Sequence, residues 1–195
     1  SGIHALKQMI KMKKTGKITT LIAGPNLIVN PTNYNRIICN PAIDIILTPS
    51  EWTHDFYGEL APEISSKLRV WPAGTEISST SSFAERKGCI VYKKDVPEDL
   101  FEFVLAELTL RNIPYTVIEY GSFKSKDYFN LLNQVKFMIY LQKVESQGLS
   151  LQEAWMRDVP TLVWNPESFT FPEGYVIHGK VSAPYLNDSN GLFFR

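Results

Sequence analysis

Two glutamates near the end of the chain, Glu145 and Glu153, are the residues whose type and spacing best support chemistry. Seven residues separate them in the segment VESQGLSLQEA. An ionised carboxylate only accepts hydrogen bonds, and its two oxygens can receive two neighbouring hydroxyl groups at once. Ribose and hexose rings offer such hydroxyl pairs, so the two acids predict a site for a sugar or a nucleotide. The alternative is a surface role, because the helix dipole alone stabilises a glutamate in a first turn.

The elements that flank the glutamates place both at one edge of a sheet. The pattern predicts a strand over residues 137–141 and a helix over 150–157, with the first glutamate in the connecting loop. In doubly wound sheets, ligands bind outside the carboxyl ends of the strands. Gly148 lets the backbone approach a ligand, and the free N–H groups of Leu149 and Ser150 point from the helix start toward an anion. The two glutamates can thus bind a sugar and a ribose, and the helix start between them can bind a phosphate. This order predicts a nucleotide-sugar site.

Apolar periodicity predicts strands that alternate with helices along the whole chain. The predicted strands are 19–23, 44–48, 68–71, 89–92, 115–119, 137–141 and 161–164. The predicted helices are 2–15, one that begins near Glu51 after the N-cap Ser50, 98–112, 126–133 and 150–157. Such alternation is typical of an α/β fold with a parallel sheet and helices on both of its faces.

The order of elements restarts after an uncharged Ser/Thr-rich stretch at 77–83, which is typical of a linker. We therefore expect an incomplete N-terminal Rossmann-like unit at 1–76, a crossover at 77–87 and a C-terminal Rossmann-like domain at 88–195. The first unit has few strands and opens on a helix with no strand before it. The last residues lack a closing helix, so we expect sequence to be missing at both ends.

Composition narrows the class of protein. Among the 195 residues, 20 Lys and Arg balance 20 Asp and Glu, which argues against nucleic acid as a partner. Cys39 and Cys89 lack metal-ligand spacing, and we expect both to be reduced. No apolar run reaches the roughly 18 residues of a membrane span, and no signal peptide is evident. We expect a cytoplasmic protein, and a peripheral membrane contact stays open.

The region around the glutamates also follows a family pattern, Glu-x-x-Gly-Leu-x-x-x-Glu-Ala and then Val-Pro and a strand, in ESQGLSLQEA and VPTLV. Its spacing resembles the signature of group 1 glycosyltransferases of the GT-B fold without gaps. Two earlier segments, IDIILTPSEW and VWPAGTE, resemble the family's late N-terminal strand and its crossover between domains. The resemblance implies a GT-B-like fold, with a complete C-terminal domain and a partial N-terminal one.

The resemblance also implies roles for the site residues. Glu145 would hold the hydroxyls of the donor sugar as the catalytic carboxylate, and Glu153 would hold the ribose hydroxyls. Backbone N–H groups of Gly148, Leu149 and Ser150 would face the sugar and the diphosphate.

The chain departs from the family in its basic residues. The family commonly has an Arg and a Lys about five residues apart, whereas this chain has Lys93 and Lys94 adjacent, with Glu98 where the second cation would fall. A diphosphate needs positive charge, so we expect Lys93 or Lys94 to face it. A solvated surface pair is the alternative.

The base of the nucleotide is expected beside the end of the next strand, where an aromatic ring and a glycine can stack on it and approach it. The residues of this turn are Tyr120, Gly121, Ser122 and Phe123. A simple turn is the alternative.

These observations predict a glycosyltransferase, a hexosyl- or pentosyltransferase that moves a sugar from a nucleoside diphosphate to a hydroxyl of a glycan or glycoconjugate. The resemblance favours retention of configuration. We expect no cofactor and no metal ion, because lysines and a helix start can stabilise the leaving diphosphate. A non-catalytic nucleotide- or glycan-binding module derived from such an enzyme, a sugar-nucleotide epimerase and a flavodoxin-like binding domain stay open.

Overall fold

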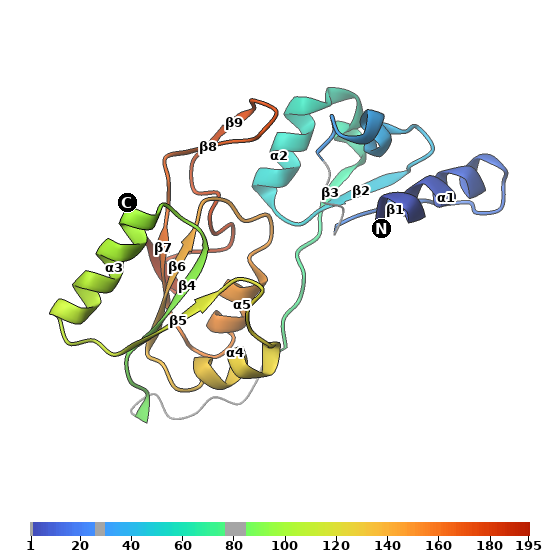
Figure 1. Cartoon of the computed structure of the whole chain (residues 1–195). Coiled ribbons are helices and arrows are strands. Elements are labelled where there is room, and N and C mark those ends of the chain that lie inside the picture. Colours follow the sequence, from blue (N-terminus) through green and yellow to red (C-terminus); the bar gives the residue numbers. More distant parts are fainter. Residues whose placement is uncertain (1, 26–29, 77–84) are drawn as a thin grey trace. The chain divides into compact units, whose positions relative to one another are not determined.

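The structure is a computed structural model of the chain and describes residues 2–25, 30–76 and 85–195. The chain forms two compact units, Ser1–Ala73 and Gly74–Arg195 (Figure 1). Most of the expected crossover at 77–87 lies outside the described residues. No helix in the described ranges is long and apolar enough to pass through a membrane.

The first unit is built around a small parallel sheet. Its strands are β1 (Ile22–Ala23), β2 (Ile45–Thr48) and β3 (Leu68–Val70), in the order β1-β2-β3. The helical segments are α1 (Gly2–Lys14), η1 (Tyr34–Cys39), α2 (Glu51–Leu60) and η2 (Pro62–Lys67). Leu6 and Ile10 of α1 join the core with Ile46 and Leu68 of the strands. Ser50 directly precedes α2 as its N-cap, as expected, and its backbone N–H donates to Thr53 Oγ1 over 3.1 Å.

The second unit contains a five-stranded parallel sheet. Its strands are β4 (Cys89–Asp95), β5 (Tyr115–Glu119), β6 (Phe137–Gln142), β7 (Thr161–Trp164) and β10 (Gly191–Phe194). The helices are α3 (Glu98–Leu110), α4 (Ser125–Leu132) and α5 (Leu149–Trp155). A separate antiparallel pair is formed by β8 (Ser168–Thr170) and β9 (Val176–His178).

The strand order identifies the point where the chain stops adding strands on one side of β4 and continues on the other side. The order is β10-β7-β6-β4-β5, so the chain starts in β4, steps to β5 on one side and then crosses to β6 on the other. This is the 2-1-3-4-5 order of doubly wound folds, in which the crevice between the first and third strands is the ligand site. In this unit that crevice lies at the carboxyl ends of β4 and β6.

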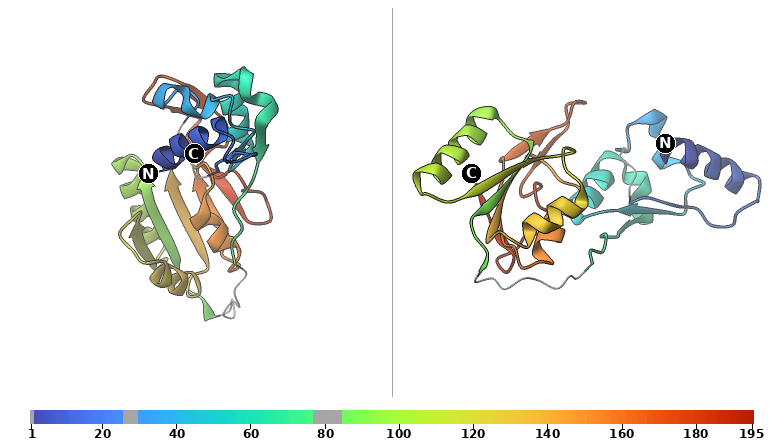
Figure 2. Two further views of the ribbon diagram at one scale, coloured as in Figure 1. Left: turned by 90° about the vertical axis from the view of Figure 1, so that its right-hand side faces the viewer. Right: turned by 60° about the horizontal axis from the view of Figure 1, so that its bottom comes forward.

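Helices lie on both faces of this sheet (Figure 2). Alternating side chains of the strands pack against them. On one face, Tyr92 and Tyr140 join the core with residues of α4 and α5. On the other face, Val91 and Ile139 pack against the Phe101 side of α3. The expected α/β fold, with a Rossmann-like parallel sheet and helices on both faces, is confirmed.

Three strands, β8, β9 and β10, were not predicted from the sequence. None of their residues is buried, whereas each of the short strands that were predicted places at least one residue in the core. The last of the three, β10, adds a fifth strand beside β7, and Gly191 makes this approach possible. A Cβ on Gly191 would lie 2.1 Å from the carbonyl oxygen of Thr161. The end of the sequence is therefore part of the sheet.

Candidate functional site

An ion pair lies at the carboxyl ends of β4 and β6, where the strand order reverses. Lys94, near the end of β4, donates from Nζ to Glu145 Oε1 over 2.6 Å, and Glu145 belongs to the loop after β6. The hydroxyl of Tyr140 donates to the same carboxylate oxygen over 2.8 Å. Only 23% of the Lys94 side chain and 11% of the Glu145 side chain are exposed. The first predicted glutamate is thus held by a cation and a phenol at the carboxyl ends of β4 and β6.

The register of β4 is irregular at Lys94, as in a β-bulge. Lys93 pairs with Leu141 and Asp95 pairs with Gln142, so Lys94 is an extra residue on β4 with no partner in the register. Bulges redirect side chains and are common beside functional sites. Lys94 follows Tyr92 by two residues, so alternation along β4 places both side chains on the same face of the sheet.

The neighbouring lysine, Lys93, points to the opposite face of the sheet. It forms an ion pair with Glu98 over 2.7 Å, and its Nζ lies 4.0 Å from the centre of the Phe101 ring on α3. The sequence left the choice between the two lysines open. The structure joins Lys94 to Glu145 and separates Lys93 from it.

Buried tyrosines form the floor beneath the ion pair. The rings of Tyr92 and Tyr140 are stacked, with centroids 4.7 Å apart. Ser150 Oγ donates to the hydroxyl of Tyr92 over 3.3 Å, and Tyr128 donates to the carbonyl of Ser150 over 2.6 Å. Burial raises the pKa of Tyr128 and of Tyr140 well above the ordinary value, so both phenols stay neutral donors. Sequence reasoning missed this floor; its signal was Tyr92 and Tyr140, each close to the end of an apolar strand.

The start of α5 depends on a glycine. Gly148 is left-handed, with φ of 70°, and a Cβ there would lie 3.2 Å from Leu151 Cδ1. Leu149 and Ser150 follow as the first residues of α5, as expected, and Leu149 is exposed. The helix has only seven residues, so its dipole is a modest source of positive charge.

Glu153 lies one turn into α5 and is partly buried. Burial raises the pKa of its carboxyl group, and the positive charge of Arg157 acts in the opposite direction. Arg157 is itself held over the Phe129 ring, 4.1 Å from the centroid. The charges of Glu145 and Glu153 both help to raise the pKa of Tyr92, after the larger effect of burial. Both predicted glutamates therefore act on the pKa of the same tyrosine of the floor.

The four residues of the predicted base-binding turn lie in different places, some beside the ion pair and one in the core. The exposed ring of Tyr120 lies 4.4 Å from Lys94 Nζ, which joins it to the ion pair. Gly121 is left-handed and exposed, with no atom within 4 Å of an added Cβ. Ser122 donates to the carbonyl of Glu119 within the turn, over 2.7 Å. Phe123 packs edge-on against Tyr92, with centroids 5.8 Å apart, so its ring belongs to the floor.

The segment before β10 also contributes to the site. The backbone N–H of Glu145 donates to the carbonyl of Val181 over 2.9 Å, which ties the β6–α5 loop to residues 181–183. Ser182, wholly buried, donates to Asn165 Oδ1 after β7 over a long 3.4 Å. Loops after β6 and β7 are thus joined around Glu145.

Two other features lie apart from this chemistry. A mostly apolar hollow of about 290 Å³ is lined by Phe137, Pro160, Thr161, Leu162, Gly191 and Leu192. It is at the amino ends of β6, β7 and β10, the opposite edge from the one where parallel sheets bind ligands. In the described ranges, no three His, Cys, Asp or Glu side chains gather in a way that could hold a metal ion.

The arrangement suits a ligand that carries both hydroxyl groups and negative charge. Such a ligand can exchange partners with the ion pair, since hydroxyls donate to the carboxylate of Glu145 and an anionic oxygen accepts from Lys94. The phenol of Tyr140 donates to the same oxygen of Glu145 as Lys94 does. The exposed ring of Tyr120 offers a surface next to the same lysine.

No family model matches the chain, and no curated protein matches it. Among solved structures, the chain is similar to one chain of the crystal structure of accessory secretory protein 1, 2 and 3 in Streptococcus pneumoniae, with 12% sequence identity and a TM-score of 0.44. The match covers 78% of this chain and 34% of that chain, about a third of its length. A TM-score below 0.5 supports no argument about function.

Proposed function

We propose that the Gly74–Arg195 unit binds a nucleoside-diphosphate sugar at the carboxyl ends of β4 and β6 and belongs to a glycosyltransferase. The observation that carries the proposal is the ion pair between Lys94 and Glu145, because it lies at the carboxyl ends of β4 and β6, where the strand order reverses. Ligands of doubly wound sheets bind at that point. The Glu-seven residues-Glu spacing gives independent support from the sequence.

In this proposal each residue receives one part of the ligand. Hydroxyls of the donor sugar displace Lys94 from Glu145, and Lys94 turns to the diphosphate. Glu153 accepts hydrogen bonds from the ribose, and its partial burial strengthens them. Tyr120 and Gly121 face the base.

The reaction would exchange one bond to the anomeric carbon for another. The bond from that carbon to the diphosphate oxygen breaks, and a bond to the hydroxyl oxygen of a glycan or glycoconjugate forms. The hydroxyl proton leaves with solvent or with the diphosphate. Lys94 stabilises the negative charge on the leaving nucleoside diphosphate, and the chemistry itself calls for no cofactor.

A second candidate is a non-catalytic module that binds a sugar or a nucleotide through the same contacts. The observation that favours it is the orientation of Lys93, which is paired with Glu98 on the α3 face. Lys94 then meets a diphosphate without its neighbour, whereas phosphoryl groups in enzymes are usually held by several positive charges. Such a module would bind the ligand and would not transfer the sugar.

One experiment tests binding and transfer in sequence. The chain is screened by thermal shift against nucleoside diphosphates and their sugar conjugates, where a ligand at about 100 times its dissociation constant adds roughly 2.7 kcal/mol of stability. Conjugates that bind are then incubated with glycan acceptors, and release of the free nucleoside diphosphate is measured. Binding with release supports the glycosyltransferase, and binding without release supports the non-catalytic module. No shift with any nucleotide or conjugate contradicts both.

A further inference from the structure

A buried glutamine at the end of β6 has an amide oxygen that no described group satisfies. Gln142 is 5% exposed, and its Nε2 donates to the carbonyl of Val144 over 2.8 Å. A carbonyl only accepts hydrogen bonds, so this contact fixes which end of the amide is nitrogen. Within the described part of the chain, the buried Oε1 of Gln142 has no hydrogen-bond partner. A buried acceptor left in this state is costly, and a ligand that donates to it recovers that cost.

The position of Gln142 connects it with Glu145. It follows Tyr140 by two residues in the same strand, so both side chains leave β6 on the same face of the sheet. Tyr140 donates to Glu145 on that face, and Val144, which holds the amide of Gln142, directly precedes Glu145. The unsatisfied oxygen therefore belongs to the edge of the sheet where the sugar would lie.

A second unsatisfied amide group flanks Glu145 on the other side of the same loop. Gln147 has a buried Nε2 with no hydrogen-bond partner among the described residues. The backbone carbonyl of Gln147 is bound by the side chain of Gln152 over 3.1 Å, which fixes the main chain next to Gly148. Along the sequence, the loop thus has one buried acceptor before Glu145 and one buried donor after it, and both are uncharged.

We propose that Gln142 and Gln147 form a subsite for the acetamido group of an N-acetylated sugar. An acetamido group has one N–H donor and one carbonyl acceptor, which complement the Gln142 oxygen and the Gln147 nitrogen. It is neutral, as the two amides are, and it hangs from the same ring whose hydroxyls bind Glu145. The inference rests on the proposed function and narrows its donor to N-acetylhexosamine conjugates of nucleoside diphosphates.

The test compares two conjugates that differ only in the acetamido group. Affinities of the full chain for a nucleoside-diphosphate hexose and for the matching nucleoside-diphosphate N-acetylhexosamine are measured by isothermal titration calorimetry. Two neutral hydrogen bonds predict that the N-acetylated conjugate binds about ten-fold more tightly. Gln142→Met removes the acceptor and is expected to reduce the preference to about three-fold or less, with little change for the plain hexose.

Two further variants keep the test independent of folding. Gln147→Met lies in the loop and removes the donor, so it also reduces the preference even where Gln142→Met fails to fold. Gln134→Met is the matched control, because Gln134 is exposed and donates to the carbonyl of Asn130 away from the loop. It leaves the preference at its full value.

The outcomes separate this inference from the proposed function. Equal affinity for both conjugates in the unmodified chain overturns the acetamido subsite and leaves the nucleotide-sugar site standing. A preference that survives both Gln142→Met and Gln147→Met also overturns the subsite, since other groups then recognise the acetamido. Binding of neither conjugate overturns both proposals. A preference lost in both variants and kept in Gln134→Met supports the subsite.

Discussion

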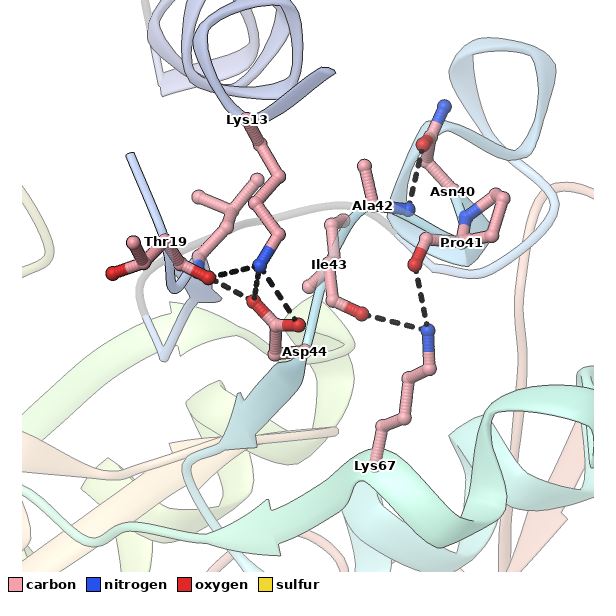
Figure 3. Close-up of polar contacts among 9 residues, drawn as sticks. Lys13, Thr19, Asn40, Pro41, Ala42, Ile43, Asp44 and Lys67 are labelled. Carbon is pink, nitrogen blue, oxygen red and sulfur yellow. Dashed lines mark hydrogen bonds and ion pairs between the residues drawn. The ribbon is translucent and has the colours of Figure 1, made fainter. Parts of the chain in front are cut away.

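The two units of the chain each contain a Lys–acid ion pair of similar length, and the two pairs differ in where they stand on their sheets. In the first unit, Lys13 lies 2.8 Å from Asp44, just before β2 begins (Figure 3). In the second unit, Lys94 lies 2.6 Å from Glu145, just after β6 ends. The first pair is at an amino end of parallel strands and the second is at a carboxyl end.

The partners of the two pairs differ as well. Asp44 accepts the backbone N–H of Leu21 over 2.7 Å, and Lys13 also donates to the carbonyl of Thr19. Nearby, Lys67 donates to the carbonyls of Pro41 and Ile43, so the whole cluster in Figure 3 ties backbone segments together. Glu145 and Lys94 are held by side chains, the phenol of Tyr140 and the ring of Tyr120. Asp44 and Lys13 thus tie their ion pair to the main chain, whereas Glu145 and Lys94 contact further side chains, which can turn toward a ligand.

The largest expected effect separates the two adjacent lysines. Lys94→Gln should weaken binding of a nucleoside-diphosphate sugar by about ten- to a hundred-fold, because it removes a charge-assisted hydrogen bond to the diphosphate. Lys93→Gln is the matched control, since it removes the same charge from the opposite face. Calorimetric titration of both variants gives the comparison. Equal losses would mean that general positive charge, and not the position of Lys94, attracts the ligand.

The two glutamates should separate the parts of the ligand. Glu153→Ala is expected to weaken the binding of the nucleoside diphosphate and of its sugar conjugate alike, by about ten-fold, because it removes charge-assisted hydrogen bonds to the ribose. Glu145→Ala should weaken only the conjugate. Competition binding with both ligands measures this difference. The assignment of roles fails where both variants lose both ligands equally.

A smaller effect is expected at the tyrosine floor. Tyr140→Phe removes the phenol that orients Glu145 and should lower the affinity for the sugar conjugate about three-fold, with unchanged affinity for the nucleoside diphosphate. Tyr128→Phe is a matched control, because Tyr128 is as buried and donates to a backbone carbonyl. Denaturant unfolding should show a loss of stability in both variants. A reduced affinity for the conjugate in both would assign the effect to general loosening of the floor.

The smallest expected effect is an opposite dependence of stability on pH in the two units. Lys13 and the N–H of Leu21 lower the pKa of Asp44, so its stabilisation is present above the ordinary pKa and is lost as the pH falls below about 4. Burial raises the pKa of Glu153, so its contribution is present at low pH and is lost as the pH rises through the raised pKa.

Two variants check these signs by thermal unfolding between pH 3 and 7. Relative to the unmodified chain, Asp44→Asn should lose most stability near pH 7 and little in acid. Glu153→Gln imitates the protonated acid, so its stability relative to the unmodified chain should increase as the pH rises. The reverse order for either variant would contradict the direction assigned to its pKa.

Most of the fold could be predicted from the sequence because its elements carry strong periodic signals. The strands β5 and β7 and the start of α3 agree with the predicted bounds to the residue, and the N-cap Ser50 was recognised from its type. The strand β10 was not predicted, and none of its residues is buried. Its place depends on Gly191 and its approach to Thr161, which no local pattern reveals.

The candidate site was predicted in part. Local spacing was enough to select the loop between the glutamates, because a strand, a glycine and a helix start follow one another in the sequence. Alternation separates Lys93 from Lys94, but the choice between them could not be made, since the face of β4 that meets Glu145 is set only when β4 pairs with β6. Gln142 was missed for a similar reason, because its unsatisfied oxygen results from burial and not from residue type. The roles of these residues in binding a ligand stay predictions.

The most direct test of the difference between the two ion pairs is hydrogen exchange of the full chain with and without a saturating nucleoside-diphosphate sugar. The carboxyl-end pair should respond, with slower exchange in peptides that cover residues 143–150. The amino-end pair should not respond, with unchanged exchange in peptides that cover residues 19–23 and 43–46. Unchanged exchange at 143–150 despite measurable binding would contradict the account, and it would mean that the ion pair of Lys94 and Glu145 is as structural as that of Lys13 and Asp44.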